Sequence, residues 1–249
     1  MLVTDDEELQ LAPDAMQALA EFMREKDEQD RRFEELRLQA ERDHEDRIVT
    51  MADFQEDWNQ SQFWYDDETA TILAESLLEG ATEDTAIALV SAPTVYVKLR
   101  EWKTTGRIPR NMTIKLLEYD VRFDVFKEDF VYYDFEYPLR GLPKDLRGKF
   151  DRVMVDPPFL SDDCQTKTAL TVRWLTKPWT PPPSIPDKDS LRIMMCTGER
   201  MCDLLAKLYR QAGVKPTDLD VRHRKGLSNV FWCYSNLPSA HFKLLEEEA

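Results

Sequence analysis

The sequence predicts an α/β fold in which a mostly parallel sheet is covered by helices on both faces. Two observations predict it. Apolar segments of strand length alternate with segments of helix length from residue 66 onward, and those apolar segments are nearly continuous. Strands buried on both faces have this continuous pattern, because the crossover helices cover both sides of the sheet. In such sheets, ligands bind beyond the carboxyl ends of the strands.

The first half of this domain contains three expected strands. Asp66 or Asp67 can cap a helix that follows the aromatic segment WNQSQFWY, and Gly80 ends this helix. The next expected elements are a strand over 85–93, a helix over 94–103, a strand over 113–120, a short helix over 121–127 and a strand over 129–135.

The second half continues the alternation. Expected here are a strand over 150–156, a helix over 161–177, a strand over 191–198, a helix from 199 with Gly213 beyond its end, and two tail strands within 219–237 around Gly226 and Asn229. Pro178 breaks the helix before it, and residues 178–190 form a proline-rich insertion.

Residues 1–50 differ from the rest and are expected to form an acidic, helical N-terminal extension, which leaves 51–249 as the main domain. Charged residues are dense from Asp14 to Arg47, and no proline or glycine follows Pro13 in this stretch. Such a helix either shows its polar face to water or binds a partner. We favour the first interpretation, because a charge-rich helix usually faces solvent.

The net charge indicates what kind of partner the chain binds. The formal net charge is -15 and the pI is about 4.7. Affinity for nucleic acid depends on neutralising phosphates with Lys and Arg, so this field disfavours a nucleic-acid partner. It favours a basic protein surface. The 7 glycines form no GxxxxGK[ST] or GxGxxG phosphate loop.

The cysteines and the hydropathy pattern bear on metals and location. The 4 cysteines are widely spaced without a CxxC pair, so we predict no metal site. The sequence shows no signal peptide and no apolar run of 18 or more residues. We therefore predict a reduced chain without membrane contact, cytosolic or nuclear, with the cytoplasm as the preferred location and a monomer as the preferred state.

Acidic residues follow two successive strands of the predicted sheet. Glu118 and Asp120 end the strand over 113–120, and Asp134 ends the strand over 129–135. A carboxylate after the second strand can accept two hydrogen bonds from a ribose diol, and Asp134 can accept one from an adenine amino group. The same acids can instead cap the helices that follow. Together with Asp156 after the next strand, their recurrence favours a site for an adenosine-bearing ligand.

The strand over 150–156 ends in Asp156-Pro157-Pro158-Phe159. Two prolines fix the backbone and remove two N–H donors, which leaves the Asp156 carboxylate and the Asp156 and Pro157 carbonyls as acceptors. This set of acceptors suits a neutral amine, whose N–H groups it can hold while the lone pair is aimed. Phe159 can pack on a flat or aliphatic part of the substrate. A plain exit from strand to loop, with Asp-Pro starting a turn, is the alternative.

Taken together, these motifs resemble those of class I S-adenosylmethionine-dependent amino-methyltransferases, in which [DN]PP[YFW] follows strand four. Five segments in order, WNQSQFWY, SAPTVY, LEYDVRF, DPPFLSDDC and CTG, resemble the eukaryotic elongation factor 1-alpha lysine methyltransferases formerly described as N6-adenine methyltransferase-like; the resemblance spans roughly residues 55–235. It implies a seven-stranded Rossmann-like sheet with an antiparallel last strand. It also implies S-adenosylmethionine as cofactor and a lysine of elongation factor 1-alpha as substrate.

The same resemblance implies two sets of site residues. The implied cofactor-binding residues are Phe63, Trp64, Tyr65, Ser91, Ala92, Pro93, Glu118, Asp120, Asp134 and Asp156, and the implied catalytic residues are Asp156, Pro157, Pro158 and Phe159. The sequence departs from the family pattern at two places. The first strand lacks the usual glycine-rich loop, so Pro93 restricts the approach of the backbone to a ligand. Phe159 replaces the commoner tyrosine, so a hydroxyl group is not needed there.

Methyl transfer to lysine needs a positioned, deprotonated amine. We expect Asp156 and the Pro157 carbonyl to bind and aim the amine while water removes the proton, with His223 as a less favoured proton acceptor. One rival function is N6-adenine methylation of DNA or RNA. The charge of -15 and the single basic run, residues 222–225, disfavour it. The other rival, a catalytically silent binding module, is disfavoured by the intact acidic strand ends.

Overall fold

The computed structural model describes residues 49–54, 56, 62–183, 190–226 and 229–245, together with Gln17, Arg24, Glu28 and Arg31. The chain divides into two compact units, Met1–Arg47 and Ile48–Ala249. The four described residues of the first unit are helical. The rest of the predicted helical extension lies outside the described residues, as do residues 184–189 of the proline-rich insertion.

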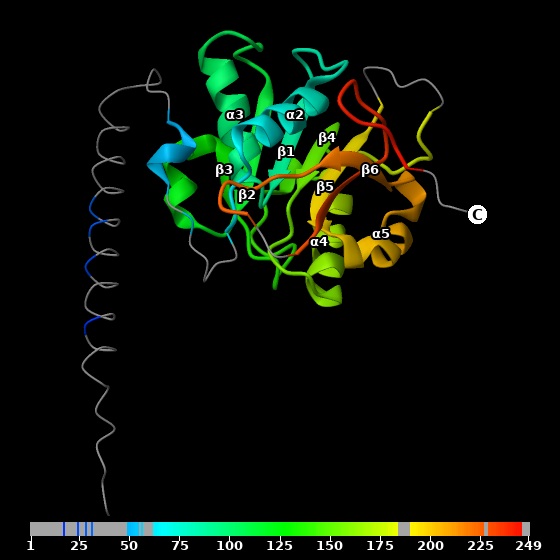
Figure 1. The fold of residues 1–249 in the computed structure, drawn as a ribbon. Helices are drawn as coiled ribbons and strands as arrows, with labels where there is room; N and C mark the ends of the chain where they lie inside the picture. Colours follow the sequence, from blue (N-terminus) through cyan, green and yellow to red (C-terminus); the bar gives the residue numbers. More distant parts are fainter. Residues whose placement is uncertain are drawn as a thin grey trace, which may run out of the picture. The chain divides into compact units, whose positions relative to one another are not determined.

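The second unit is built on a seven-stranded sheet with the order β3-β2-β1-β4-β5-β7-β6 (Figure 1). Strand β7 is antiparallel to both of its neighbours, and the other pairings are parallel. This confirms the predicted seven-stranded, mostly parallel sheet with an antiparallel last strand. The strands are β1 Ala86–Val90, β2 Thr113–Glu118, β3 Phe130–Tyr132, β4 Arg152–Val155, β5 Arg192–Gly198, β6 Lys215–Asp220 and β7 Phe231–Ser235.

Helices cover both faces of the sheet (Figure 1). The α-helices are α2 Asp67–Leu78, α3 Pro93–Thr104, α4 Asp162–Leu175 and α5 Cys202–Leu208. The short 3-10 segments are η1 Met51–Asp53, η3 Val121–Asp129, η4 Lys144–Leu146, η5 Glu199–Met201 and η6 Arg210–Ala212. Helices α2 and α3 pack together, while α4 and α5 lie on the other side of the sheet. Asp66 caps α2 as predicted, because its side chain accepts the Thr69 N–H at 2.7 Å.

The core forms where alternate residues of each strand point to opposite faces. Ala88, Val153 and Ile193 belong to the buried cluster that also contains Val172 of α4 and Leu205 of α5. The intervening strand residues are also buried, and all five residues of β1 are buried. Burial on both faces explains why these strands read as continuous apolar runs.

Three predicted elements differ from the structure. The strand expected over 129–135 is shorter, because β3 ends at Tyr132 and Asp134 follows in the loop. The first tail strand was expected within 219–237, but β6 begins at Lys215, includes Pro216 and ends at Asp220. Because β6 lies at the edge of the sheet, it tolerates a proline. The helix expected from residue 199 is a short α5 between two 3-10 turns, and Gly213 ends this segment in the left-handed conformation, with φ of 72°.

The sheet also fixes the position of a ligand site. Strand β1 lies between β2 and β4, so the strand order reverses between β1 and β4. The crossovers from these two strands leave on opposite sides, which opens a crevice beyond their carboxyl ends. Ser91 follows β1 and Asp156 follows β4, so both residues lie at this crevice.

Candidate functional site

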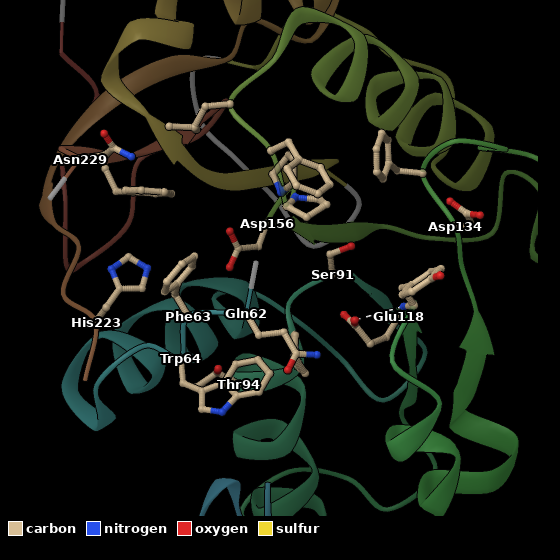
Figure 2. Close-up of a pocket in the computed structure, with 18 of the residues that line it drawn as sticks. Gln62, Phe63, Trp64, Ser91, Thr94, Glu118, Asp134, Asp156, His223 and Asn229 are labelled. Atoms are coloured by element: carbon tan, nitrogen blue, oxygen red, sulfur yellow. Dashed lines mark hydrogen bonds between the residues drawn. The ribbon is translucent and has the colours of Figure 1, made fainter. Parts of the chain in front are cut away.

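A cavity of about 1040 Å³ lies at the carboxyl ends of β1, β2 and β4. It brings together ten residues that the sequence predicted, and Figure 2 shows several of them around the same space. They are Phe63, Trp64, Ser91, Pro93, Glu118, Asp134, Asp156 and Phe159, with Pro157 and Pro158 between the last two. Three other predicted residues, Tyr65, Ala92 and Asp120, are buried and do not line the cavity.

The turn after β1 does without the usual glycine-rich loop. Ser91 adopts a left-handed conformation with φ of 53°, which glycine usually supplies, and its N–H donates to the Leu117 carbonyl at 2.8 Å. Pro93 occupies the first turn of α3 and lines the cavity with Thr94. The N-terminus of α3, where backbone N–H groups lack helical acceptors, therefore opens onto the cavity.

Glu118, the last residue of β2, is buried and faces the cavity (Figure 2). Its Oε1 accepts hydrogen bonds from the N–H groups of Tyr119 at 3.1 Å and Asp120 at 3.2 Å. Its Oε2 has no donor among the described residues. Burial raises the pKa of Glu118 to about 8, although the two backbone hydrogen bonds oppose the shift. The carboxyl group is thus ready for a donor or a cation that enters the cavity.

Asp120 was expected beside Glu118, but its carboxylate is turned to other partners. Oδ2 of Asp120 accepts from Nε2 of Gln62 at 2.7 Å and from Nε of Arg122 at 2.8 Å. Arg122 also donates to Oε1 of Gln62 at 2.8 Å. These contacts fasten the segment that contains Gln62 to the end of β2, so Asp120 positions a wall of the cavity.

Asp134 lies two residues beyond β3 and lines the cavity with Phe135 and Glu136. Its Oδ1 accepts the Glu136 N–H at 2.9 Å, which closes a tight turn. The ring of Phe135 contacts that of Phe159, with 5.4 Å between centroids. The loop after β3 and the loop after β4 therefore meet at the mouth of the cavity.

Asp156 lies at the centre of the site and is half-buried. The Tyr65 hydroxyl donates to its Oδ2 at 2.6 Å. Burial raises the pKa of Asp156 to about 7, and the hydrogen bond from Tyr65 opposes the shift. No described residue donates to the Asp156 or Pro157 carbonyl. The predicted set of acceptors is therefore present in the cavity wall.

The loop over residues 156–160 is held from behind by residues that sequence reasoning missed. Nε2 of Gln165 donates to the Phe159 carbonyl at 3.0 Å and to Oγ1 of Thr197 at 3.1 Å. Arg200 donates to the Leu160 carbonyl at 2.9 Å. A Cβ at Gly198 would lie 2.9 Å from Leu160, so glycine allows the loop to approach β5. The glycine of the CTG segment was the one signal of this support in the sequence.

A short antiparallel pairing closes another wall of the cavity. Tyr65 bridges His223, the Arg224 N–H donates to the Trp64 carbonyl at 2.9 Å, and the Asp66 N–H donates to the Arg222 carbonyl at 3.1 Å. The predicted covering segment is thus fixed to the loop between β6 and β7. Tyr65 lies behind this wall, where it reaches Asp156.

The basic run over residues 222–225 forms part of this wall. Two of its charges are paired, Arg222 with Asp220 at 2.8 Å and Lys225 with Glu56 at 2.9 Å. His223 lines the cavity. Burial lowers the pKa of His223 to about 4, although Glu56 and Asp66 oppose the shift. His223 is therefore neutral at neutral pH.

The described part of the chain contains no group of three or more His, Cys, Asp or Glu side chains placed to hold a metal ion. None of the described helices is long and apolar enough to cross a membrane.

Comparison with known proteins identifies related chains. A family model described as "Probable N6-adenine methyltransferase" matches residues 56–239. A relative from Saccharomyces cerevisiae named "Protein-lysine N-methyltransferase EFM5" is 40% identical over 237 residues, which cover 94% of each chain. A human relative named "EEF1A lysine methyltransferase 1" is 37% identical over 236 residues, which cover 94% of this chain and 95% of that one.

One solved structure supports the fold. A branched-chain polyamine synthase mutein from Thermus thermophilus, in complex with N4-aminopropylspermidine and 5'-methylthioadenosine, aligns with a TM-score of 0.54. The alignment covers 77% of this chain and 60% of that chain at 10% identity. At this identity the likeness concerns the arrangement of the sheet and its helices.

The buried carboxyl of Glu118 has a measurable effect on stability. Its pKa is raised from 4.5 to about 8, so the folded protein binds a proton that the unfolded chain has released, and stability falls as the pH rises through that range. Glu118→Gln keeps the size of the side chain and removes the charge. We expect this variant to melt several degrees higher than wild type at pH 8, with a gain that shrinks towards pH 5.

Thermal unfolding followed by circular dichroism at both pH values measures this difference. Glu136→Gln is the matched control, because Glu136 is an exposed carboxyl at the same cavity. An equal change in melting temperature at both pH values would contradict the assignment of a buried, unpaired carboxyl.

Proposed function

The chain belongs to the family described as probable N6-adenine methyltransferases, and we propose that it is an S-adenosylmethionine-dependent protein-lysine N-methyltransferase acting on elongation factor 1-alpha. The family match covers residues 56–239, which include every residue that lines the cavity. The similarity to the yeast and human relatives extends over 94% of the chain, and both of those proteins are named as lysine methyltransferases. This similarity carries the lysine assignment.

The cavity fits S-adenosylmethionine on chemical grounds. Its two carboxyl groups, buried Glu118 and half-buried Asp156, suit a ligand that brings hydroxyl donors and a positive charge. Oε2 of Glu118 can accept from the ribose, and Asp134 can accept from the adenine amino group. The open N-terminus of α3 suits the carboxylate of the methionine part. Tyr119, which sequence reasoning missed, can pack on the adenine ring.

Asp156 and the Pro157 carbonyl bind and aim the acceptor amine in this proposal. S-adenosylmethionine supplies an electrophilic methyl group, which the amine nitrogen takes while the carbon–sulfur bond breaks and its electron pair stays with sulfur. Nearby cations favour the ionised form of Asp156, whose pKa is about 7 before any ligand binds. An ionised Asp156 accepts N–H hydrogen bonds and fixes the direction of the lone pair. The amine proton leaves to water.

Methylation of an adenine amino group is the main alternative, since the same acceptors can hold that amine. The net charge of -15 opposes a polyanionic substrate. Of the basic residues in the run over 222–225, Arg222 and Lys225 are paired with carboxylates, which reduces the charge available for phosphate. A catalytically silent module is disfavoured because the acidic strand ends are intact and the Tyr65 hydroxyl holds Asp156 in the cavity wall. The monomeric state and the cytoplasmic location stay predictions from the sequence.

Replacing Asp156 tests the proposed role directly. We expect Asp156→Ala to lower the single-turnover rate by about 100-fold or more, because the amine loses its main acceptor, with a smaller change in cofactor affinity. The assay follows tritium from labelled S-adenosylmethionine into purified elongation factor 1-alpha, with single- and double-stranded DNA and RNA as rival substrates. Asp162→Ala is the matched control, because Asp162 is an exposed aspartate six residues further along the chain.

Full single-turnover activity of Asp156→Ala would show that Asp156 does not aim the amine. Label in nucleic acid but not in protein would establish the adenine alternative. Cofactor binding without methyl transfer to any of these substrates would show that the substrate assignment is wrong. The cofactor assignment would still stand.

The pH dependence of cofactor affinity provides a second test. Asp156 and Glu118 are neutral below their raised pKa values and ionise as the pH rises through about 7 and 8, so affinity for a cationic ligand should increase over that interval. Tyr65→Phe removes the hydrogen bond that favours ionised Asp156 and should move the increase to higher pH. Titration calorimetry at several pH values measures both effects.

S-adenosylhomocysteine is the control ligand, because it lacks the positive sulfonium, and its affinity should depend less on pH. The assignment fails if both ligands show the same pH dependence in wild type and in Tyr65→Phe.

A further inference from the structure

The cavity extends to both sides of Asp156 (Figure 2). On one side lie Ser91, Glu118 and Asp134, which the proposed function assigns to the cofactor. On the other side lie Phe63, His223 and Asn229. This second side, which we call the outer lobe, also contains Phe231. Of its residues, only Phe63 is among those that the family resemblance implies for the cofactor.

Aromatic rings form a continuous path from the outer lobe to Asp156. The ring of Phe231 meets that of His223 edge-on, with centroids 5.2 Å apart. His223 in turn contacts Tyr65, with centroids 5.0 Å apart, and the Tyr65 hydroxyl donates to Asp156 at 2.6 Å. Because Tyr65 and His223 also bridge through their backbones, this path has a fixed geometry.

The described wall of the outer lobe is suited to a chain that carries a positive charge at its end. Burial keeps His223 neutral at neutral pH, with its pKa lowered to about 4. Neighbouring Arg222 and Lys225 are paired with carboxylates, and Arg200, which also lines the cavity, donates to the Leu160 carbonyl. Arg224 is exposed and does not line the cavity. Aromatic faces pack on methylene groups and attract an ammonium group.

We propose that the acceptor lysine enters through the outer lobe, with its methylene chain against Phe63, His223 and Phe231 and its amine at Asp156. The inference rests on the proposed function and specifies which part of that site binds the acceptor. His223 then forms a neutral part of the wall of the outer lobe, because a positive charge there would repel the incoming lysine. It is a specificity-determining residue for the acceptor and takes no proton.

Docking of the acceptor protein on the face near β3 is the competing interpretation. Tyr132 and Tyr137 are exposed aromatic residues there, with 50% and 47% of their surface accessible. Tyr132 is the last residue of β3 and Tyr137 lies in the loop after it, and neither lines the cavity. If the acceptor protein inserts its lysine from that side, these tyrosines and not the outer lobe contact it. They therefore supply matched control variants.

The test compares steady-state kinetics of methyl transfer to elongation factor 1-alpha. We expect His223→Lys to raise the KM for the acceptor protein at least tenfold, because a fixed positive charge repels the incoming lysine. His223→Phe keeps a neutral ring and should stay within about threefold of wild type. Phe231→Ala should also raise the acceptor KM, while Tyr132→Ala and Tyr137→Ala should not. Affinity for S-adenosylmethionine and melting temperature are measured for each variant.

Two results would overturn the proposal. One is an acceptor KM that rises in Tyr132→Ala or Tyr137→Ala and stays unchanged in His223→Lys and Phe231→Ala. The other is an equal loss of activity in His223→Phe and His223→Lys with cofactor affinity intact, which would show that the charge of the wall is irrelevant. Failure of the proposed function looks different, because wild type itself would then bind the cofactor without labelling elongation factor 1-alpha.

Discussion

Two carboxyl groups, Glu118 and Asp156, share one cavity, and no described cation is paired with either of them. Their burial raises both pKa values, and the nearby Asp156 carboxylate adds to the rise in the pKa of Glu118. A free protein with this arrangement gives up stability at neutral pH. A cationic ligand in the cavity stabilises the ionised carboxylates. The burial that destabilises the free protein therefore also favours the binding of a cation.

The surrounding structure holds these two groups in place. The reversal of strand order between β1 and β4 brings their carboxyl ends to one crevice. Ser91 makes the tight turn that a glycine usually makes, and Asp120 fastens Gln62 and Arg122 to the end of β2. Gln165 supports the loop after β4 from below. Each support lies outside the direct path of a ligand, yet each fixes the position of an acceptor oxygen.

The sequence predicted the fold and most of the cavity lining, because strand ends can be located from apolar runs and their polar neighbours. Glu118, Asp134 and Asp156 were found this way. Spacing alone could not show that Asp120 points away from the cavity while Glu118 faces it. The orientation of Asp120 depends on its hydrogen bonds with Gln62, which is 58 positions away, and with the side chain of Arg122. The contact of Tyr65 with Asp156 joins residues 91 positions apart and left no local signal. Pro216 concealed β6, since its place at the sheet edge becomes evident only with the whole strand order.

We infer that Glu118 and Asp156 are partly protonated in the free protein and ionise when the cofactor binds. Proton release on cofactor binding tests this inference most directly. Calorimetric titration with S-adenosylmethionine at pH 7, in buffers that differ in ionisation enthalpy, measures how many protons leave the protein. The account predicts net proton release, because a cation in the cavity lowers the pKa values of Asp156 and Glu118 from about 7 and 8. The release should shrink in Glu118→Gln. A binding enthalpy that is the same in every buffer would mean that no net proton leaves the two carboxyl groups on binding, and this result would contradict the coupling between their protonation and cofactor binding.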